Sequence, residues 1–249
     1  MELTVLGRYS PFPAPGGAMN GYLVQHGNTR LLLDAGNGVA SRLMERLPIE
    51  HLTAVVCSHL HEDHIADVHC LRFAQMGAQQ AGRTEAKLQI YAPAEPAEKH
   101  QWIEGGEQWQ DLHTYDPEQP LVLGDLEIRF TRTNHPIPCY AMRIKPVGAE
   151  GPVLFYTADT GYCPPLVEAA RGANLLLIEA SLTEEFESKK QFGHLSAAEA
   201  AAFARDAGVK RALFTHLYPG LAPQALLDEA RPVHAAVEVA EEGRTYRIA

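Results

Sequence analysis

The chain has 249 residues, of which 46% are hydrophobic and 21% are charged, and its net charge is −10. This composition is typical of a globular protein with ample material for a core. The negative charge argues against broad electrostatic binding of nucleic acid, which depends on Lys and Arg neutralising phosphates. The chain lacks a run of about 18 apolar residues and a basic N-terminal stretch followed by a long apolar one. We therefore expect no membrane span, no membrane partner and no secretory signal.

Four cysteines are scattered along the chain without a C-x-x-C pair. This spacing argues against a zinc knuckle and against a disulfide framework, and it favours a reducing cytoplasm as the location of the protein.

The N-terminal part is expected to be mainly β-structure. Residues 3–6 form a short apolar run, residues 7–21 are a long Pro- and Gly-containing loop, and residues 22–25 and 30–34 favour a hairpin. Three leucines precede Asp34 at the end of the second hairpin strand. Asp34 could either support a nearby site or cap the helix expected over residues 39–47, and the sequence leaves both roles open.

The next segment, His59-Leu60-His61-Glu62-Asp63-His64, holds four side chains of metal-ligand type within six residues. Residues 52–57 before it are apolar and β-branched and predict a buried strand, and the apolar pattern after it predicts a helix. Burying these polar groups unpaired costs free energy, and a metal would supply the pairing. With 12 His in the chain, this pattern is expected by chance about once in a thousand such sequences. Two ligands at the strand end and two at the helix start favour two metals, with Glu62 facing solvent.

The middle of the chain is harder to interpret. Residues 76–86 are expected to form a polar loop, residues 87–91 a strand and residues 93–102 a short helix. Residues 104–120 show no clean period. Strands are expected again over residues 126–131, 139–145 and 152–157. His135 lies between two of these strands and, on its own, would be interpreted as a surface residue.

Polar side chains recur at the ends of later apolar strands, namely Asp159, Glu179 and His216. Their repetition predicts that these strand ends converge on one site. His194 lies just before Ser196, which with Glu199 forms a capping-box pattern for an Ala-rich helix through residue 207. A helix over residues 223–229 and strands over 233–239 and 245–248 complete the chain. The absence of a linker or repeat predicts one domain over residues 1–249.

Taken together, His59-x-His61-x-Asp63-His64, His135, Asp159 and His216 resemble the metallo-β-lactamase superfamily across essentially the whole chain. Gly193-His194-Leu195-Ser196 before an Ala-rich helix, and Asp34 and Glu179 in their strand ends, are similar to the ribonuclease Z branch. The resemblance implies an α/β fold, an αββα sandwich of two mixed β-sheets flanked by helices. It also implies two divalent metal ions at one edge of the sandwich.

By position, the resemblance assigns one metal to His59, His61 and His135, and the other to Asp63, His64 and His216, with Asp159 as a bridge. It also implies catalytic roles for His194 and Asp63 and supporting roles for Asp34 and Glu179. Nitrogen and carboxylate donors without thiolate favour zinc, and manganese or iron fit the same donors. Two cations side by side lower the pKa of a shared water from about 15.7 to about 7, which gives a bridging hydroxide for hydrolysis.

The expected activity is that of a dinuclear phosphodiesterase, with His194 donating a hydrogen bond or proton to the phosphate or leaving oxygen. Ribonuclease Z enzymes carry a tRNA-gripping arm between the third histidine and the bridging aspartate, but only 23 residues separate His135 from Asp159. A small or nucleotide-like diester is therefore the favoured substrate, and RNA is less favoured.

Three alternatives stay open. They are a tRNA 3′-processing endonuclease, a hydrolase of carboxylic esters, lactones or thioesters, and a binding protein without catalysis on an old enzyme fold. A homodimer is expected by resemblance alone.

Overall fold

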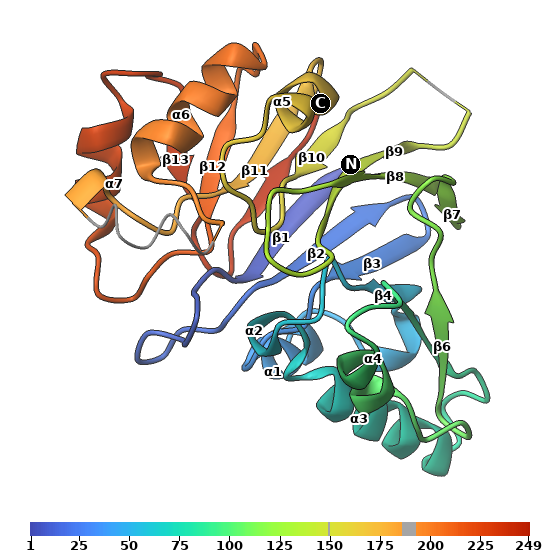
Figure 1. Cartoon of the computed structure of the whole chain (residues 1–249). Coiled ribbons are helices and arrows are strands. Elements are labelled where there is room, and N and C mark those ends of the chain that lie inside the picture. Colours follow the sequence, from blue (N-terminus) through green and yellow to red (C-terminus); the bar gives the residue numbers. More distant parts are fainter. Residues whose placement is uncertain (149, 186–192) are drawn as a thin grey trace.

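The computed structural model describes residues 1–148, 150–185 and 193–249, which form two seven-stranded sheets flanked by helices (Figure 1). The first sheet contains, in spatial order, β14 (Thr245–Arg247), β1 (Glu2–Gly7), β2 (Gly21–His26), β3 (Thr29–Leu33), β4 (Ala54–Val56), β5 (Leu88–Ala92) and β6 (Gln110–Thr114). The second contains β13 (Val237–Val239), β12 (Ala212–Thr215), β11 (Leu175–Glu179), β10 (Leu154–Tyr156), β9 (Tyr140–Pro146), β8 (Leu126–Arg132) and β7 (Leu121–Leu123).

The helices divide between the outer faces of the two sheets (Figure 1). On the first sheet lie α1 (Val39–Met44), the 3₁₀ turn Ile49–His51, α2 (Glu62–Ile65), α3 (Val68–Gln80) and α4 (Ala97–Ile103). On the second lie α5 (Pro164–Ala170), α6 (Ala197–Asp206) and α7 (Pro223–Ala230).

Three apolar clusters fill the spaces between these layers. One joins the first sheet to α1 and α3, one lies between the two sheets and includes Tyr22 and Tyr156, and one joins the second sheet to α5, α6 and α7. Burial on both faces explains why strands such as β3, β4 and β11 are continuous apolar runs rather than alternating ones. The predicted αββα sandwich of two mixed sheets is confirmed.

The direction of the strands decides where a site can form. Strands β3 to β6 of the first sheet are parallel, and so are β10 to β13 of the second. The carboxyl ends of parallel strands meet at one edge of a sheet, where ligands commonly bind. The predicted convergence of the strand ends is therefore built into the topology.

Several expected elements have different bounds in the structure. The expected loop over residues 76–86 is wrong in its first part, because α3 continues to Gln80 and the amides of Gln75 and Gln79 donate hydrogen bonds to the carbonyl of Ala86. The helix expected over residues 93–102 begins only at Ala97. The helix expected over residues 39–47 ends at Met44.

Four elements were not predicted at all. Strand β6 lies in the stretch without clean period, and β7, α5 and the 3₁₀ turn were not expected. Within the described ranges, none of the helices has both the length and the apolar character needed to cross a bilayer.

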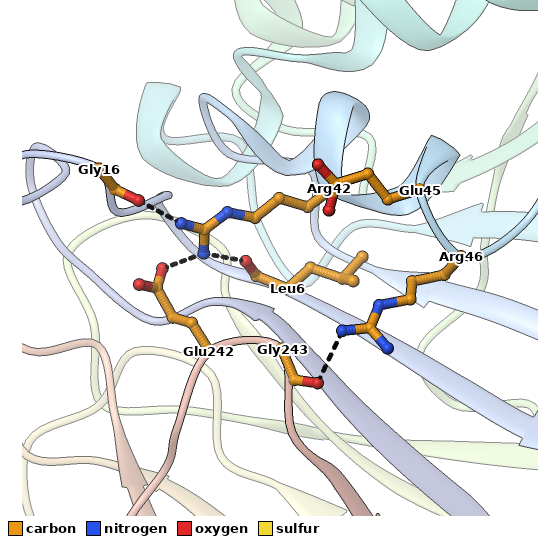
Figure 2. A pocket seen from close by; sticks show the side chains of 7 residues that line it. All are labelled: Leu6, Gly16, Arg42, Glu45, Arg46, Glu242 and Gly243. Atoms are coloured by element: carbon orange, nitrogen blue, oxygen red, sulfur yellow. Dashed lines mark hydrogen bonds and ion pairs between the residues drawn. The ribbon is translucent and has the colours of Figure 1, made fainter.

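The long N-terminal loop is anchored on the side of α1. The Arg42 guanidinium donates hydrogen bonds to the carbonyls of Leu6 and Gly16 and pairs with Glu242, as Figure 2 shows. These residues line a cavity of about 520 Å³. None of the lining residues is a predicted site residue, and the contacts of Arg42 hold the loop in place.

Candidate metal centre

Seven side chains predicted as ligands come together at the shared edge of the two sheets. The loop after β4 carries His59 and His61, and α2 carries Asp63 and His64. The second sheet contributes His135 from the loop before β9, Asp159 from the turn after β10, and His216 directly after β12. All are buried except His61, which is half-buried. The site therefore joins both halves of the chain.

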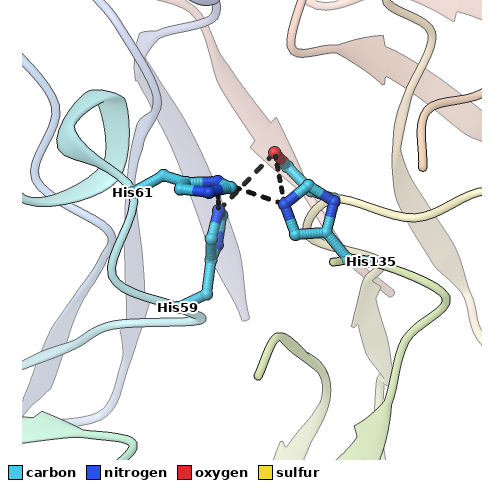
Figure 3. A group of neighbouring side chains, drawn as sticks. His59, His61 and His135 are labelled. Atoms are coloured by element: carbon cyan, nitrogen blue, oxygen red, sulfur yellow. Dashed lines mark hydrogen bonds and ion pairs between the residues drawn. The ribbon is translucent and has the colours of Figure 1, made fainter. Parts of the chain in front are cut away.

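The first group of ligands is made of three imidazoles. Figure 3 shows the rings of His59, His61 and His135 pointing toward one another. His61 Nδ1 lies 3.1 Å from His59 Nε2 and 3.1 Å from His135 Nε2. With bonds of about 2.1 Å, a tetrahedral zinc ion holds its ligand atoms about 3.3–3.4 Å apart. Both distances are therefore close to the ligand spacing of a metal site.

The second group contains Asp63, His64 and His216. His216 Nε2 lies 3.4 Å from Asp63 Oδ2, and His64 Nε2 lies 3.6 Å from the same oxygen.

Asp159 faces both groups, one with each carboxylate oxygen. Its Oδ2 lies 3.6 Å from His59 Nε2 and 4.0 Å from His135 Nε2. Its Oδ1 lies 3.3 Å from His64 Nε2 and 3.1 Å from His216 Nε2. The Asp159 carboxylate therefore lies between the two ligand groups, with one oxygen toward each.

The donor set fits a divalent metal. Two buried atoms that face each other, Asp159 Oδ1 and His216 Nε2, make no hydrogen bond of acceptable geometry with any described residue. Buried polar atoms are nearly always paired in folded proteins, so orphaned atoms in a cluster of imidazoles and carboxylates indicate that the cluster binds a cation. Candidate ligand atoms in each group lie within 4.8 Å of one another. Divalent metal binding is therefore a property of this cluster.

Behind the first sheet's ligands, the buried carboxylate of Asp34 fixes two histidines. His64 Nδ1 donates to Asp34 Oδ2 at 2.8 Å. Ser58 Oγ donates to the same oxygen at 2.8 Å and lies 3.0 Å from His59 Nδ1. With the outer nitrogens of both rings used in this way, their Nε2 lone pairs point into the site. Asp34 also accepts from the Ser58 amide and the Tyr156 hydroxyl.

Glu179 plays the same part behind the second sheet's ligands. His194 Nδ1 donates to its carboxylate at 3.0 Å. Ser181 Oγ donates to it at 2.7 Å and lies 2.7 Å from His216 Nδ1. Each carboxylate therefore holds one histidine directly and a second one through a serine.

The ring of His194 packs against one histidine of each ligand group. His194 is not one of the ligands of the first group. Its ring is stacked on that of His216 at 5.1 Å and meets the ring of His135 edge-on at 5.4 Å. Because Nδ1–H donates to Glu179, Nε2 is the nitrogen left for other contacts.

The titration behaviour of the two groups differs in the metal-free protein. Burial lowers the pKa of His59 well below its ordinary value and lowers that of His135 to about 4. Burial also opposes charge on His216, but the carboxylates of Asp159 and Asp63 outweigh it and raise the pKa to about 10. The pKa of His64 is raised in the same way. The first group thus offers neutral imidazoles, while in the second a cation would replace protons.

Backbone strain gathers at the same edge. Within the described ranges, three residues other than glycine adopt positive φ, and they are Asp34 (56°), Ala158 (52°) and His216 (57°). Each follows a strand that ends at the site. Such conformations cost of order 1 kcal/mol or more and persist where the surroundings enforce them. The fold therefore enforces these backbone conformations at the strand ends that carry the ligands and their supporting residues.

Several residues at the site were not predicted from the sequence. Ser10 Oγ donates to Asp63 Oδ2 at 2.7 Å, and Asn20 Nδ2 lies 3.2 Å from His64 Nε2. Ser58, Tyr156 and Ser181 support the ligands as described above. Ser58 directly precedes His59 and Ser181 lies two residues after Glu179, and this nearness in the sequence was the available signal. Ser10, Asn20 and Tyr156 lie 44 to 122 residues from their partners, and the sequence holds no local signal for them. Glu62 is solvent-facing as expected and pairs with Lys99.

Comparison with known proteins places this geometry in a family. Residues 29–217 match the family model described as the beta-lactamase superfamily domain. The chain is 37% identical to the "Probable metallo-hydrolase YhfI" of Bacillus subtilis over 98% of each chain. The crystal structure of that protein superposes with a TM-score of 0.92 at 35% identity, again over 98% of each chain.

Two further relatives carry more specific names. Ribonuclease Z of Methanopyrus kandleri is 28% identical over all of this chain and 98% of its own. The crystal structure of a diphosphatase from the PhnP family shares the fold with a TM-score of 0.80 at 17% identity, over 100% of this chain and 98% of its own. With its buried His and Asp cluster, the chain belongs to the metallo-hydrolases of the beta-lactamase superfamily.

Proposed function

We propose that the protein is a dinuclear metal-dependent phosphodiesterase that hydrolyses a small or nucleotide-like phosphodiester. One divalent ion would be held by His59, His61 and His135. The other would be held by Asp63, His64 and His216, and Asp159 would contact both ions. Zinc suits these nitrogen and carboxylate donors, and manganese or iron fit the same set. The single observation that carries the proposal is the position of Asp159, whose two oxygens face different ligand groups.

Two ions at these positions would supply a nucleophilic hydroxide at neutral pH and stabilise negative charge on the phosphate oxygens. The protein's own part is orientation. Asp34 and Glu179 fix the histidine rings, and Ser10 orients the Asp63 carboxylate. The reacting groups therefore meet a rigid set of donors, which lowers the entropic cost of reaching the transition state.

His194 is the proposed catalytic histidine. Burial disfavours its charged form, but the Glu179 carboxylate outweighs this effect and raises the pKa of the imidazole. With Nδ1 engaged by Glu179, Nε2 can donate a hydrogen bond or proton to the phosphate or to the leaving oxygen. Asp63, beside the second ligand group, would act both as ligand and in orienting the nucleophile.

The size of the substrate is inferred from the connection between His135 and Asp159. Its described residues are two strands and their turns, β9 and β10, with no separate arm among them. The chain also has a net charge of −10. A long polyanion would need many cationic contacts. Both features favour a small diester over precursor tRNA.

We also propose a cellular location, a domain organisation and an oligomeric state. All four cysteines are free thiols, which suits a reducing cytoplasm. The ligands come from both halves of the chain, which supports one domain over residues 1–249. A homodimer is proposed only by analogy with ribonuclease Z.

The proposal is tested with a panel of substrates. Metal-reconstituted protein is assayed against a chromogenic phosphodiester, a carboxylic ester, a thioester and a precursor tRNA. We expect turnover of the phosphodiester and little of the others. Hydrolysis of the ester or thioester alone would overturn the phosphodiesterase assignment, and preference for the precursor tRNA would overturn the choice of a small substrate.

The role of His194 has its own test. His194→Ala should lose about 10²–10⁴-fold in kcat, the usual range for an acid or base in catalysis, while elemental analysis finds nearly unchanged metal content. Asp159→Asn serves as the contrasting variant, because it should lose metal as well as activity. A fully active, metal-replete His194→Ala variant would remove the proposed role.

A further inference from the structure

A second cavity opens at the same edge as the metal cluster. It has a volume of about 320 Å³, within the range of about 300–1,000 Å³ that is usual for small-ligand pockets. Its walls come from three segments of the chain, and the lining residues are Pro93, Ala94 and Glu95, then Tyr115 and Pro117, and then Pro138 and Tyr140. We call it the ring cavity. No predicted site residue lines it.

The topology sets the ring cavity beside the ligands. Strands β4, β5 and β6 are parallel neighbours. The metal-ligand segment follows β4, Pro93 directly follows β5, and Tyr115 directly follows β6. The third wall belongs to the loop that carries His135, because Pro138 is three residues further along. The cavity therefore continues the same edge from the three-histidine group toward β6.

Direct hydrogen bonds tie two of its walls to the metal-ligand segment. The Tyr115 hydroxyl donates to the carbonyl of Cys57 at 3.0 Å, and the Tyr140 amide donates to the carbonyl of Ser58 at 3.1 Å. These carbonyls lie just before His59 in the chain. A ligand in the ring cavity would thus keep a fixed distance from the metal centre.

The walls are rigid and mainly apolar. Tyr115 is buried, its ring is stacked on Phe130 at 4.1 Å with an angle of 5°, and it meets Tyr140 edge-on at 5.8 Å. The Arg132 guanidinium lies 5.6 Å from the centre of the Tyr140 ring and donates to the carbonyls of Ile137 and Cys139, which holds this wall. Proline rings supply much of the remaining surface. A lining of aromatic and proline rings favours contact with a flat aromatic group.

The charge on the lining of this cavity does not favour a phosphate there. Glu95 is the one charged side chain among the described residues that line it. Its carboxylate repels a phosphate but accepts hydrogen bonds from the N–H groups of a heteroaromatic ring. The cation positions at the histidine cluster attract the phosphate instead. The metal centre therefore favours the phosphate of a nucleotide-like molecule, and the ring cavity favours its ring.

We propose that the ring cavity binds the uncharged heteroaromatic ring, of nucleobase type, of a phosphodiester whose phosphate lies at the metal centre. This inference rests on the proposed phosphodiesterase function and narrows its substrate class. A ring held between Tyr140 and the proline walls gains stacking and burial that a sugar phosphate alone does not.

The experiment compares two probes that differ only in the ring. Adenosine 5′-monophosphate and ribose 5-phosphate are titrated by calorimetry into the metal-reconstituted protein. We expect the nucleotide to bind about 10-fold or more tightly than the sugar phosphate, as stacking of one base on an aromatic side chain would give. Equal affinity of the two probes for the unmodified protein would overturn the proposal.

Three variants locate the binding. Tyr140→Ala should lose most of the 10-fold preference and keep its affinity for ribose 5-phosphate. Ala94→Trp, which fills the cavity from an exposed position without removing a contact, should have the same effect. Phe73→Ala removes another exposed ring, 53% accessible on α3, and should retain the preference. Metal content is measured for each variant, and loss of the preference in Phe73→Ala but not in Ala94→Trp would contradict the assignment.

Two further outcomes separate this inference from the parent proposal. If the protein prefers the nucleotide but turns over no phosphodiester, ring binding stands and the phosphodiesterase assignment fails. If a proline-rich peptide competes for the cavity and the nucleotide does not, the ring cavity is a peptide site and the inference fails.

Discussion

At the scale of single residues, the metal centre is organised by two buried carboxylates. Asp34 and Glu179 each hold one histidine directly and a second one through a serine. Both carboxylates are fully buried, where an ion is stable only if its oxygens are well paired. The same hydrogen bonds that stabilise these charges also select which nitrogen of each ring faces the metal.

Replacing Asp34 by Asn tests this arrangement. The new amide group would bring a donor against the donors of Ser58, His64 or Tyr156, so we expect a loss of about 3 kcal/mol in the unfolding free energy of the metal-free protein. Metal affinity should fall about 10- to 100-fold. Urea unfolding and chelator competition measure the two effects.

Asp111→Asn is the matched control for this substitution. The Asp111 side chain is 41% exposed and pairs with Lys87. Its loss should change stability by no more than about 0.5 kcal/mol. Similar losses in both variants would contradict the special role of the buried carboxylate.

At the scale of elements, short caps and turns decide where the site residues stand. Helix α6 begins directly after Ser196, whose hydroxyl accepts from the Glu199 amide at 3.1 Å, while the Glu199 carboxylate accepts from the Ser196 amide at 3.0 Å. His194 lies two residues before this cap. The capping box therefore fixes both the helix start and the chain segment that presents His194.

Ser196→Ala should lower the unfolding free energy by about 1 kcal/mol, which corresponds to a fall of about 2–4 °C in Tm for a chain of this size. Thermal unfolding of the metal-replete protein measures it. Ser41→Ala on α1 is the control, because Ser41 is exposed and makes no cap bond. A Tm for Ser196→Ala that equals that of the control would show that the cap does not stabilise α6.

The elements that the sequence predicted share clear local signals. The capping box of α6 and the apolar runs of β3, β4 and β11 are local patterns with one interpretation each. Strand β6 escaped prediction because it is an edge strand with only Gln110 buried, so its side chains do not alternate clearly. The end of α3 escaped because its final residues are polar and are held by side-chain bonds to Ala86.

The site shows the same division. The cluster from His59 to His64 is a local signal, but His135 and His216 gained their assignment only through the resemblance to a family. Ser10 and Asn20 are ordinary loop residues until the fold brings them against Asp63 and His64.

At the scale of the whole molecule, the metal centre joins the two halves of the sandwich. The first sheet and its helices contribute His59, His61, Asp63 and His64, and the second sheet contributes the other three ligands. Ions that bind only the folded chain stabilise it by mass action, by about 2.7 kcal/mol when the free ion is at 100 times its Kd. Chelator-depleted protein should therefore unfold at a Tm lower by roughly 5–10 °C than protein reconstituted with zinc or manganese.

The Asp159→Asn variant makes this a test of the site rather than of metal binding in general. Without the carboxylate that faces both groups, added metal should raise its Tm by much less than it raises that of the unmodified protein. An equal rise in both proteins would mean that the ions bind elsewhere. No rise in the unmodified protein would mean that the cluster does not hold metal in the folded state, because a ligand that binds only the native chain must stabilise it.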